Sequence, residues 1–155
     1  MTKRSSAEQA KLEGAISDLF EHRIRFNEVL GLKLQSMMPP TLRFEMRPEL
    51  VGHYVYGRLH GGVISAALDA TGGMALMVAI GDKHPDESAE QVMHRFAKMG
   101  TIDLRIDYLR PAIGERFELK AQVLRLGSRV ASTRMEFHGA DGELFASGAA
   151  AYIVS

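Results

Sequence analysis

The chain has 155 residues, of which 46% are hydrophobic and 25% are charged, with 19 basic residues against 19 acidic residues and no cysteine. These values predict one globular domain of ordinary soluble composition and exclude a mainly disordered chain, because a chain of this size buries roughly two thirds of its unfolded surface in one core. The zero net charge argues against a dedicated nucleic-acid or anionic-membrane binder, and the missing cysteine excludes a thiolate nucleophile and cysteine-bound metals.

The N-terminal segment predicts a helix and no secretory signal. The basic pair Lys3-Arg4 has no apolar stretch behind it, so we expect a cytoplasmic protein. Between residues 6 and 30, apolar side chains recur at steps of three and four, which is the period of an amphipathic helix. Gly31 is the expected stop signal. Residues 1–30 are therefore treated as a helical extension of a main domain formed by residues 31–155.

The next segments predict two short strands and a long core helix. Residues 32–38 and 41–47 alternate apolar and polar side chains around a Pro-Pro turn, and residues 48–59 form a loop. Residues 61–80 are apolar on every side except for Asp69, which predicts a helix buried nearly all round. A membrane span fits less well, because this stretch holds four glycines and no basic flank.

The last part of the chain predicts an antiparallel sheet. Residues 84–98 form a short surface helix or a loop, and residues 101–109 alternate strictly, as a strand with one covered face does. Further strands are expected at 117–126, 130–138 and 144–154. Without strand-helix-strand units, the fold class is α+β, with the long helix against the concave side of the sheet.

The segment His60-Gly61-Gly62 is the first candidate for chemistry. It lies at the expected start of the core helix, where unpaired backbone amides and the positive end of the helix dipole can bind an oxyanion. Glycines let a ligand atom approach those amides closely. The alternative is a tight turn into the helix that His60 merely caps.

Asp69 is the second candidate. A carboxylate on a buried helix is costly unless it is paired or functional, so Asp69 is either a general base or a structural residue bonded to an amide or an arginine. Asp69 follows Gly61 by eight positions, which is about 12 Å along a helix. One substrate carbonyl cannot readily touch both residues of one chain. If both act on one substrate, they come from different subunits of a symmetric dimer.

Taken together, these motifs resemble the hotdog-fold acyl-CoA thioesterases, in the branch of the phenylacetate-pathway type. The resemblance is carried by His60-Gly61-Gly62, Asp69, the segment from Thr101 to Ala112 with Tyr108-Leu-Arg110-Pro111, and the turn Gly127-Ser128-Arg129. It covers roughly residues 30–155. It implies a hotdog fold, an antiparallel sheet around a long central helix, with homodimers that form a continuous sheet, possible homotetramers, and sites at the dimer interface.

The resemblance also implies roles for individual residues. Asp69 would be the general base or nucleophile, the Gly61 amide would polarise the thioester carbonyl beside His60, and Thr101 would help to position the water. His53 and Tyr54 occupy the two positions where the family often has an asparagine. The remaining candidates for binding the substrate and the phosphates of coenzyme A are Gly62, Tyr108, Arg110, Pro111, Arg125, Gly127, Ser128 and Arg129. Met74, Met77, Met93 and Met99 could line an acyl pocket or belong to the core.

The sequence thus predicts a thioesterase that hydrolyses small to medium or aromatic acyl-CoA thioesters. We expect no metal and no cofactor, with coenzyme A entering only as part of the substrate, and no nucleic-acid partner or membrane insertion. The alternatives are a non-catalytic acyl-CoA or lipid-binding hotdog protein, motivated by the missing asparagine, and a hotdog-type dehydratase.

Overall fold

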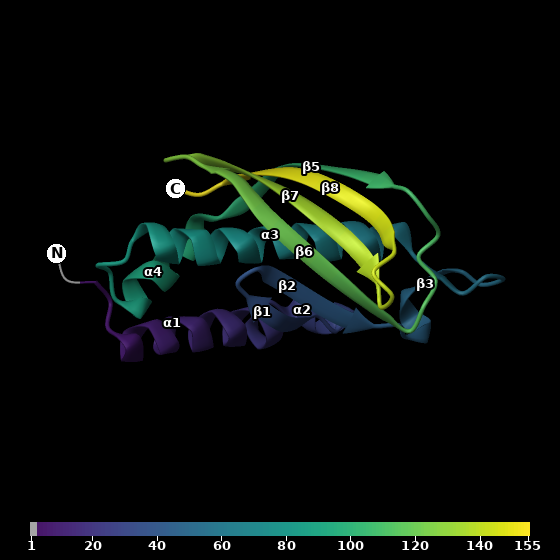
Figure 1. Cartoon of the computed structure of the whole chain (residues 1–155), viewed down its shortest axis with the longest axis horizontal. Coiled ribbons are helices and arrows are strands. Elements are labelled where there is room, and N and C mark those ends of the chain that lie inside the picture. The colour runs from purple at the N-terminus through teal and green to yellow at the C-terminus, as the bar shows by residue number, and fades with distance from the viewer. Residues whose placement is uncertain (1–2) are drawn as a thin grey trace.

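The computed structural model describes residues 3–155, in which an antiparallel sheet wraps around one long helix (Figure 1). The helices are α1 (Ser6–Asp18), a π-helical turn η1 (Leu19–Arg23), α2 (Arg25–Leu30), a 3-10 turn η2 (Pro48–Leu50), α3 (Gly61–Lys83), α4 (Ala89–Arg95) and a 3-10 turn η3 (Phe96–Lys98). The strands are β1 (Lys33–Met37), β2 (Pro40–Glu45), β3 (Val51–His53), β4 (Arg58–Leu59), β5 (Gly100–Tyr108), β6 (Arg116–Leu126), β7 (Val130–Gly139) and β8 (Leu144–Ile153). The α+β hotdog architecture expected from the sequence is confirmed.

The N-terminal helix is interrupted, whereas the sequence predicts one continuous helix. The π turn ends at Ile24, whose backbone (φ −82°, ψ 93°) is extended rather than helical. Gly31 ends α2 in the left-handed conformation (φ 72°), which confirms the predicted stop. The break separates α1, whose Leu12 and Ile16 pack near α4, from α2, which contacts α3.

The segment before α3 also differs from the prediction. Instead of a plain loop, it contains the turn η2 and a small hairpin of β3 and β4, in which Val51 pairs with Leu59 and His53 pairs with Arg58. Strands of two and three residues are too short to give a readable alternation. The hairpin projects from one end of the molecule and delivers the chain to the start of α3 (Figure 1).

The main sheet has the order β1-β2-β6-β7-β8-β5, so β5 pairs with β8 and leaves its other edge open within the chain. All four strands predicted after residue 100 are present. The strict alternation predicted for β5 is broken by a bulge, since the pairing register shifts between Thr101 and Asp103. An extra residue in one strand re-aims the side chains beside it. Thr101 therefore shares a face with its neighbour Tyr152, on the side of α3.

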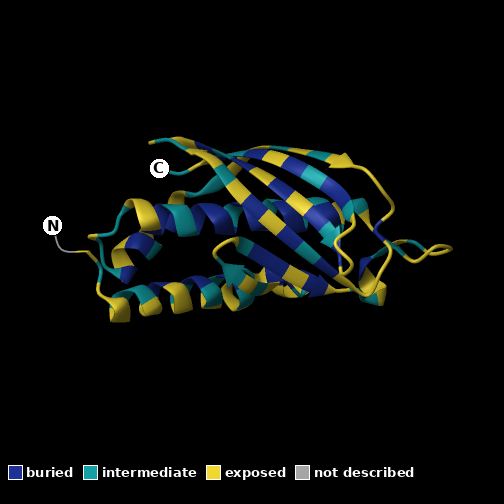
Figure 2. Cartoon of the chain, in the orientation of Figure 1, coloured by how far each residue is buried: buried dark blue, intermediate teal, exposed yellow. Residues whose placement is uncertain are grey.

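Helix α3 is the core of the fold, but it is not buried all round as its sequence suggests. Leu68, Met74 and Leu76 are fully buried, whereas a stripe that includes Asp69 and Gly73 stays half-exposed (Figure 2). By length and composition α3 could cross a membrane, yet 56% of its apolar 18-residue window is buried inside the chain. The helix therefore has one open face, and Asp69 lies on it.

The adjacent glycines of α3 occupy different surroundings, which gives a prediction for stability. A Cβ at Gly72 would lie 2.3 Å from the Tyr152 hydroxyl, whereas a Cβ at Gly73 would meet nothing within 4 Å. We expect Gly72→Ala to lower the free energy of unfolding by about 1–3 kcal/mol through overpacking. Gly73→Ala should raise it by up to about 1 kcal/mol, because alanine favours helix. Urea denaturation measures both, and shifts of the same sign would contradict this difference.

Candidate active site

The first turn of α3 leaves one backbone amide free. The His60 Nδ1 atom accepts a hydrogen bond from the Gly62 amide at 2.8 Å, and the amides of Val63 and Ile64 donate to the His60 carbonyl. The Gly61 amide has no acceptor within the described residues 3–155. His60 is thus the helix cap, as the alternative interpretation of the sequence holds, and its capping leaves the Gly61 amide available to an oxyanion.

A cavity of about 500 Å³ surrounds this turn. Its lining includes His53, Gly61, Tyr108, Arg110 and Pro111. The Tyr108 hydroxyl donates to the Gly61 carbonyl at 2.9 Å and so ties the end of β5 to the start of α3. The His53 ring stacks on Tyr56 at 5.0 Å, and its Nδ1 atom is buried without a hydrogen-bond partner among the described residues. His53 is thus a polar residue of the cavity lining whose Nδ1 atom has unused hydrogen-bonding capacity among the described residues.

Asp69 lies two turns further along α3, and two neighbouring strands hold it. The Thr101 hydroxyl donates to Asp69 Oδ1 at 2.9 Å, and the Tyr152 hydroxyl donates to the Asp69 backbone carbonyl at 3.0 Å. The bulge in β5 turns Thr101 toward the helix and makes the first bond possible. The carboxylate is half-exposed on the open face of α3. A half-exposed, oriented carboxylate of this kind can take a proton from a water molecule.

The sequence does not predict a role for Tyr152 beside Asp69. Burial raises the pKa of its phenol above the ordinary value, and the nearby Asp69 carboxylate raises it further. The phenol therefore stays protonated and remains a donor to the backbone beside Asp69. Its position in β8 is that of a core residue, so the sequence carries no signal for this role.

An apolar cavity of about 270 Å³ opens beside Asp69 and Thr101. Met77 and Met99 line it, as two of the four candidate methionines, whereas Met74 is fully buried in the main core. Other lining residues come from η1 and α2 and were not predicted: Phe20, Ile24, Phe26 and Asn27.

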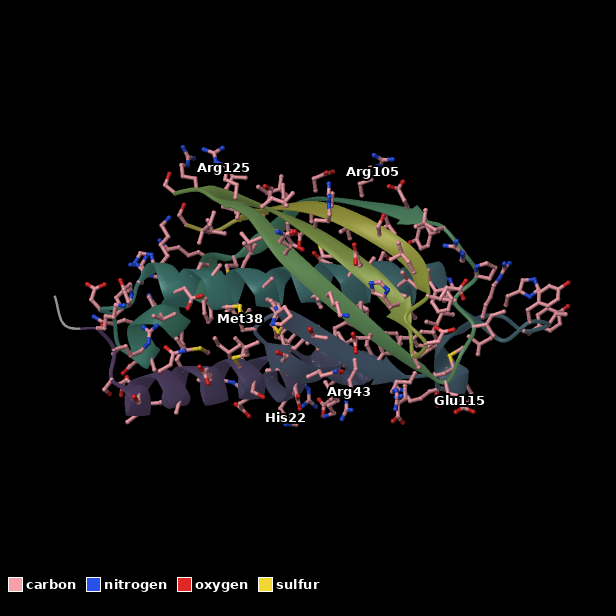
Figure 3. All side chains as sticks on the ribbon, viewed as in Figure 1. His22, Met38, Arg43, Arg105, Glu115 and Arg125 are labelled. Atoms are coloured by element: carbon pink, nitrogen blue, oxygen red, sulfur yellow. The ribbon has the colours of Figure 1, made fainter. Side chains whose placement is uncertain are left out.

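The candidates for phosphate binding divide into two groups within one chain. Arg110 lies near the start of α3, where it pairs with Glu143 at 3.3 Å and donates to the Leu144 carbonyl. The turn Gly127-Ser128-Arg129 lies near the other end of α3, since Lys83 Nζ is 3.4 Å from the Gly127 carbonyl. Arg125 projects from the same end (Figure 3). One protomer therefore does not bring the two groups together.

The remaining predicted site residues are exposed or support the helix start. Tyr54 is 92% exposed at the tip of the β3–β4 hairpin. Gly62 is exposed and donates to the His60 cap. Within residues 3–155 no group of three or more His, Asp or Glu side chains is arranged to hold a metal ion.

Known proteins are similar to this chain in sequence and in fold. A family model described as the thioesterase superfamily matches residues 56–146. The medium/long-chain acyl-CoA thioesterase YigI of Escherichia coli K12 is 40% identical over 152 residues, which cover 96% of each chain. A crystal structure of a Shewanella oneidensis protein related to the thioesterase superfamily matches with a TM-score of 0.89 at 33% identity, over 97% of this chain and 100% of that one. A mutant of the phenylacetic acid degradation protein PaaI from Thermus thermophilus shares the fold, with a TM-score of 0.66 at 24% identity over 84% of this chain and 99% of that one.

Proposed function

The chain belongs to the thioesterase superfamily and is an acyl-CoA thioesterase, and from this premise we propose that it hydrolyses medium-chain acyl-CoA at a site shared by two copies of the chain. The observation that carries the proposal is the pairing of an oriented carboxylate, Asp69 held by Thr101, with the free Gly61 amide on the same helix. The sequence predicts small to medium or aromatic acyl groups, and the YigI relative is named a medium/long-chain acyl-CoA thioesterase. Medium chains are common to both ranges. The apolar cavity beside Asp69 suits such chains better than it suits a polar acyl group.

The proposed reaction uses water as the attacking group. Asp69 takes one proton from the water as its oxygen forms a bond to the thioester carbonyl carbon, and the carbonyl electrons move onto the oxygen. The Gly61 amide donates to this oxyanion, where it is a fixed dipole that needs no reorganisation. When the intermediate collapses, the carbon–sulfur bond breaks, and Asp69 returns its proton to the thiolate of coenzyme A. We propose that His53, which lines the same cavity as Gly61, donates a second hydrogen bond to the oxyanion or to the water.

Replacing Asp69 by asparagine tests this assignment. We expect Asp69→Asn to lower kcat by at least about a hundredfold, because only the proton acceptor is lost. Release of free coenzyme A thiol from octanoyl-CoA measures kcat, and circular dichroism checks the fold. Near wild-type turnover would rule out Asp69 as the base. A wild type that binds acyl-CoA without releasing thiol would favour the binding-protein alternative, and hydration of an enoyl-CoA would favour the dehydratase.

The edge strand β5 supports the idea of a shared site. Thr101, near one end of β5, holds Asp69, and Tyr108, at the other end, holds Gly61. If β5 pairs antiparallel with β5 of a second copy, each Thr101 comes near the partner's Tyr108. Asp69 of one protomer then approaches the partner's Gly61, although the two residues are about 12 Å apart within one helix. The same pairing would cover the open sheet edge, which isolated sheets rarely leave bare.

The charges of β5 are compatible with an antiparallel pairing centred on Leu104, and Arg105 also pairs with Asp107 within the chain at 2.9 Å. In this pairing Leu104 lies opposite the partner's Leu104. The residue before Leu104 in one strand therefore lies opposite the residue after Leu104 in the other. Asp103 then faces the partner's Arg105, and Arg105 faces the partner's Asp103, so both cross-strand pairs join opposite charges. Ile102, which is 58% exposed in the single chain, would be covered by the partner. This symmetry makes β5 complementary to itself.

A charge swap tests the register. We expect Asp103→Arg alone to weaken dimerisation, because it sets like charges opposite one another at two places. Arg105→Asp added to it should restore dimerisation, because the swapped pairs again join opposite charges. Sedimentation equilibrium of the single and double variants measures the dimer dissociation constant. An additive loss in the double variant would exclude this register.

Mixing two inactive variants tests the shared site itself. Asp69→Asn lacks the base, and Gly61→Pro lacks the amide donor at a helix position that tolerates proline. Random exchange makes half of the dimers mixed, and each mixed dimer contains one intact site, so about a quarter of wild-type activity should return. Confirmed subunit exchange without recovered activity would contradict a site built from two chains.

In such a dimer the two arginine groups would come together on one coenzyme A. Antiparallel α3 helices place the partner's Gly127 turn toward the end of the molecule where Arg110 lies. Arg110 and the partner's Arg129 would then bind phosphates of one nucleotide through paired donors. We include these contacts in the proposal as groups that bind the substrate and take no part in the chemistry.

A further inference from the structure

We propose that Gly73 sets the longest acyl chain that the protein accepts, because its missing side chain keeps open the apolar cavity that begins at Asp69. This inference rests on the proposed function and adds the specificity residue of that site. It follows from three observations: the alignment of Asp69, Gly73 and Met77 on one helix face, the open space above Gly73, and the aromatic wall opposite it.

Asp69, Gly73 and Met77 follow one another at steps of four residues along α3. Residues at this spacing lie on one helix face. All three line the 270 Å³ cavity together with Thr101, which bonds the Asp69 carboxylate. A thioester whose carbonyl carbon lies at Asp69 therefore has its alkyl tail directed along this face, first past Gly73 and then toward Met77.

Gly73 has the smallest side chain of the three residues and leaves free space above its backbone. A Cβ built on Gly73 meets nothing within 4 Å, whereas one on Gly72 lies 2.3 Å from the Tyr152 hydroxyl. Packing within the chain therefore explains why Gly72 has no side chain and does not explain Gly73. The cavity beside Gly73 supplies the missing reason.

The opposite wall comes from the interrupted N-terminal helix. Phe20 is 1% exposed and fixed in the core, while Phe26 is 60% exposed and lines the cavity from α2. Ile24, at the break between η1 and α2, lies between them in the chain and also lines the cavity. A large exposed phenylalanine is costly in water, and contact with an alkyl chain would cover part of it.

The length of the path matches a medium chain. Asp69 and Met77 are eight residues apart, which is about 12 Å along the helix. Carbon–carbon bonds of about 1.5 Å at near-tetrahedral angles advance an extended alkyl chain by about 1.25 Å per carbon, so a chain of about nine or ten carbons spans the path. A dodecanoyl chain then reaches past Met77, and a butyryl chain ends before Gly73. A side chain at Gly73 would divide the path near its middle.

The test measures kcat/KM for butyryl-, octanoyl- and dodecanoyl-CoA with the wild type, Gly73→Ala and Gly73→Leu. Each buried methylene is worth about fourfold in binding, so the four carbons of leucine should lower kcat/KM for dodecanoyl-CoA by at least roughly tenfold and change butyryl-CoA by less than about twofold. Gly73→Ala should show the same trend at about fourfold or less. Gly14→Leu is the matched control, because Gly14 also has open space around its Cβ but lies on α1 away from the cavity.

A second arm removes the opposite wall. Phe26→Ala should lower kcat/KM for dodecanoyl-CoA and leave butyryl-CoA unchanged, because only a long tail reaches α2. An equal loss for every chain length in Gly73→Leu would overturn the proposal, and so would no loss at all. Dissociation of the Gly73→Leu dimer in size-exclusion chromatography would also overturn it, since Gly73 would then be a packing position against the partner helix.

Binding separates this proposal from the proposed function. Butyl- and dodecyl-CoA thioethers cannot be hydrolysed, and calorimetry gives their dissociation constants. If the wild type releases no thiol but Gly73→Leu still weakens only the dodecyl compound, the hydrolytic function fails and the pocket stands. If the wild type hydrolyses acyl-CoA but the thioether affinities fall equally in Gly73→Leu, the pocket fails and the function stands.

Discussion

A carboxylate on the helix that forms the core is the constraint on which the rest of this structure depends. Burying an unpaired charge costs far more than one domain can spare, so the sheet cannot close over the face of α3 that carries Asp69. Strands β6 to β8 pack against α3, and the half-exposed stripe of α3 receives the hydroxyl of Thr101. The bulge in β5 and the core position of Tyr152 meet the same requirement. The bulge lets Thr101 donate to the Asp69 carboxylate, and the Tyr152 hydroxyl donates to the Asp69 backbone carbonyl.

The sequence predicts the fold well wherever periodicity is long. The strands after residue 100 alternate over nine to eleven residues, and the glycine at position 31 takes the left-handed backbone that a helix end needs. Periodicity fails at short or irregular features. A π turn keeps apolar residues on nearly the same face, so the break at Ile24 is invisible in the pattern, and the hairpin of β3 and β4 is shorter than any readable alternation.

Some residues of the candidate site can also be predicted from the sequence, and others cannot. Asp69 and Gly61 are predicted because their residue types and spacing carry chemistry, and Thr101 is predicted from the resemblance to the hotdog thioesterases. The structure places the Thr101 hydroxyl on the Asp69 carboxylate and leaves the Gly61 amide free within the described residues. Tyr152 and Phe20 are not predicted, because a buried aromatic residue in a strand or helix has the pattern of any core residue. The separation of the two arginine groups cannot be predicted from the sequence, because it depends on the folded chain. Residue 110 lies near the start of α3, and residue 127 lies near its other end.

Part of the cavity wall comes from η1 and α2, and residues there can be substituted more freely than the residues proposed for catalysis. The proposed catalytic groups belong to α3 and β5, where the His60 side chain caps the helix and Thr101 bonds the Asp69 carboxylate. Phe26 belongs to a short helix that contacts α3 from outside the sheet and is largely exposed, so its volume can change without repacking the core. One wall of the proposed acyl pocket therefore lies in a segment that carries none of the proposed catalytic groups, and this N-terminal segment of some thirty residues can diversify in evolution while the reaction stays the same.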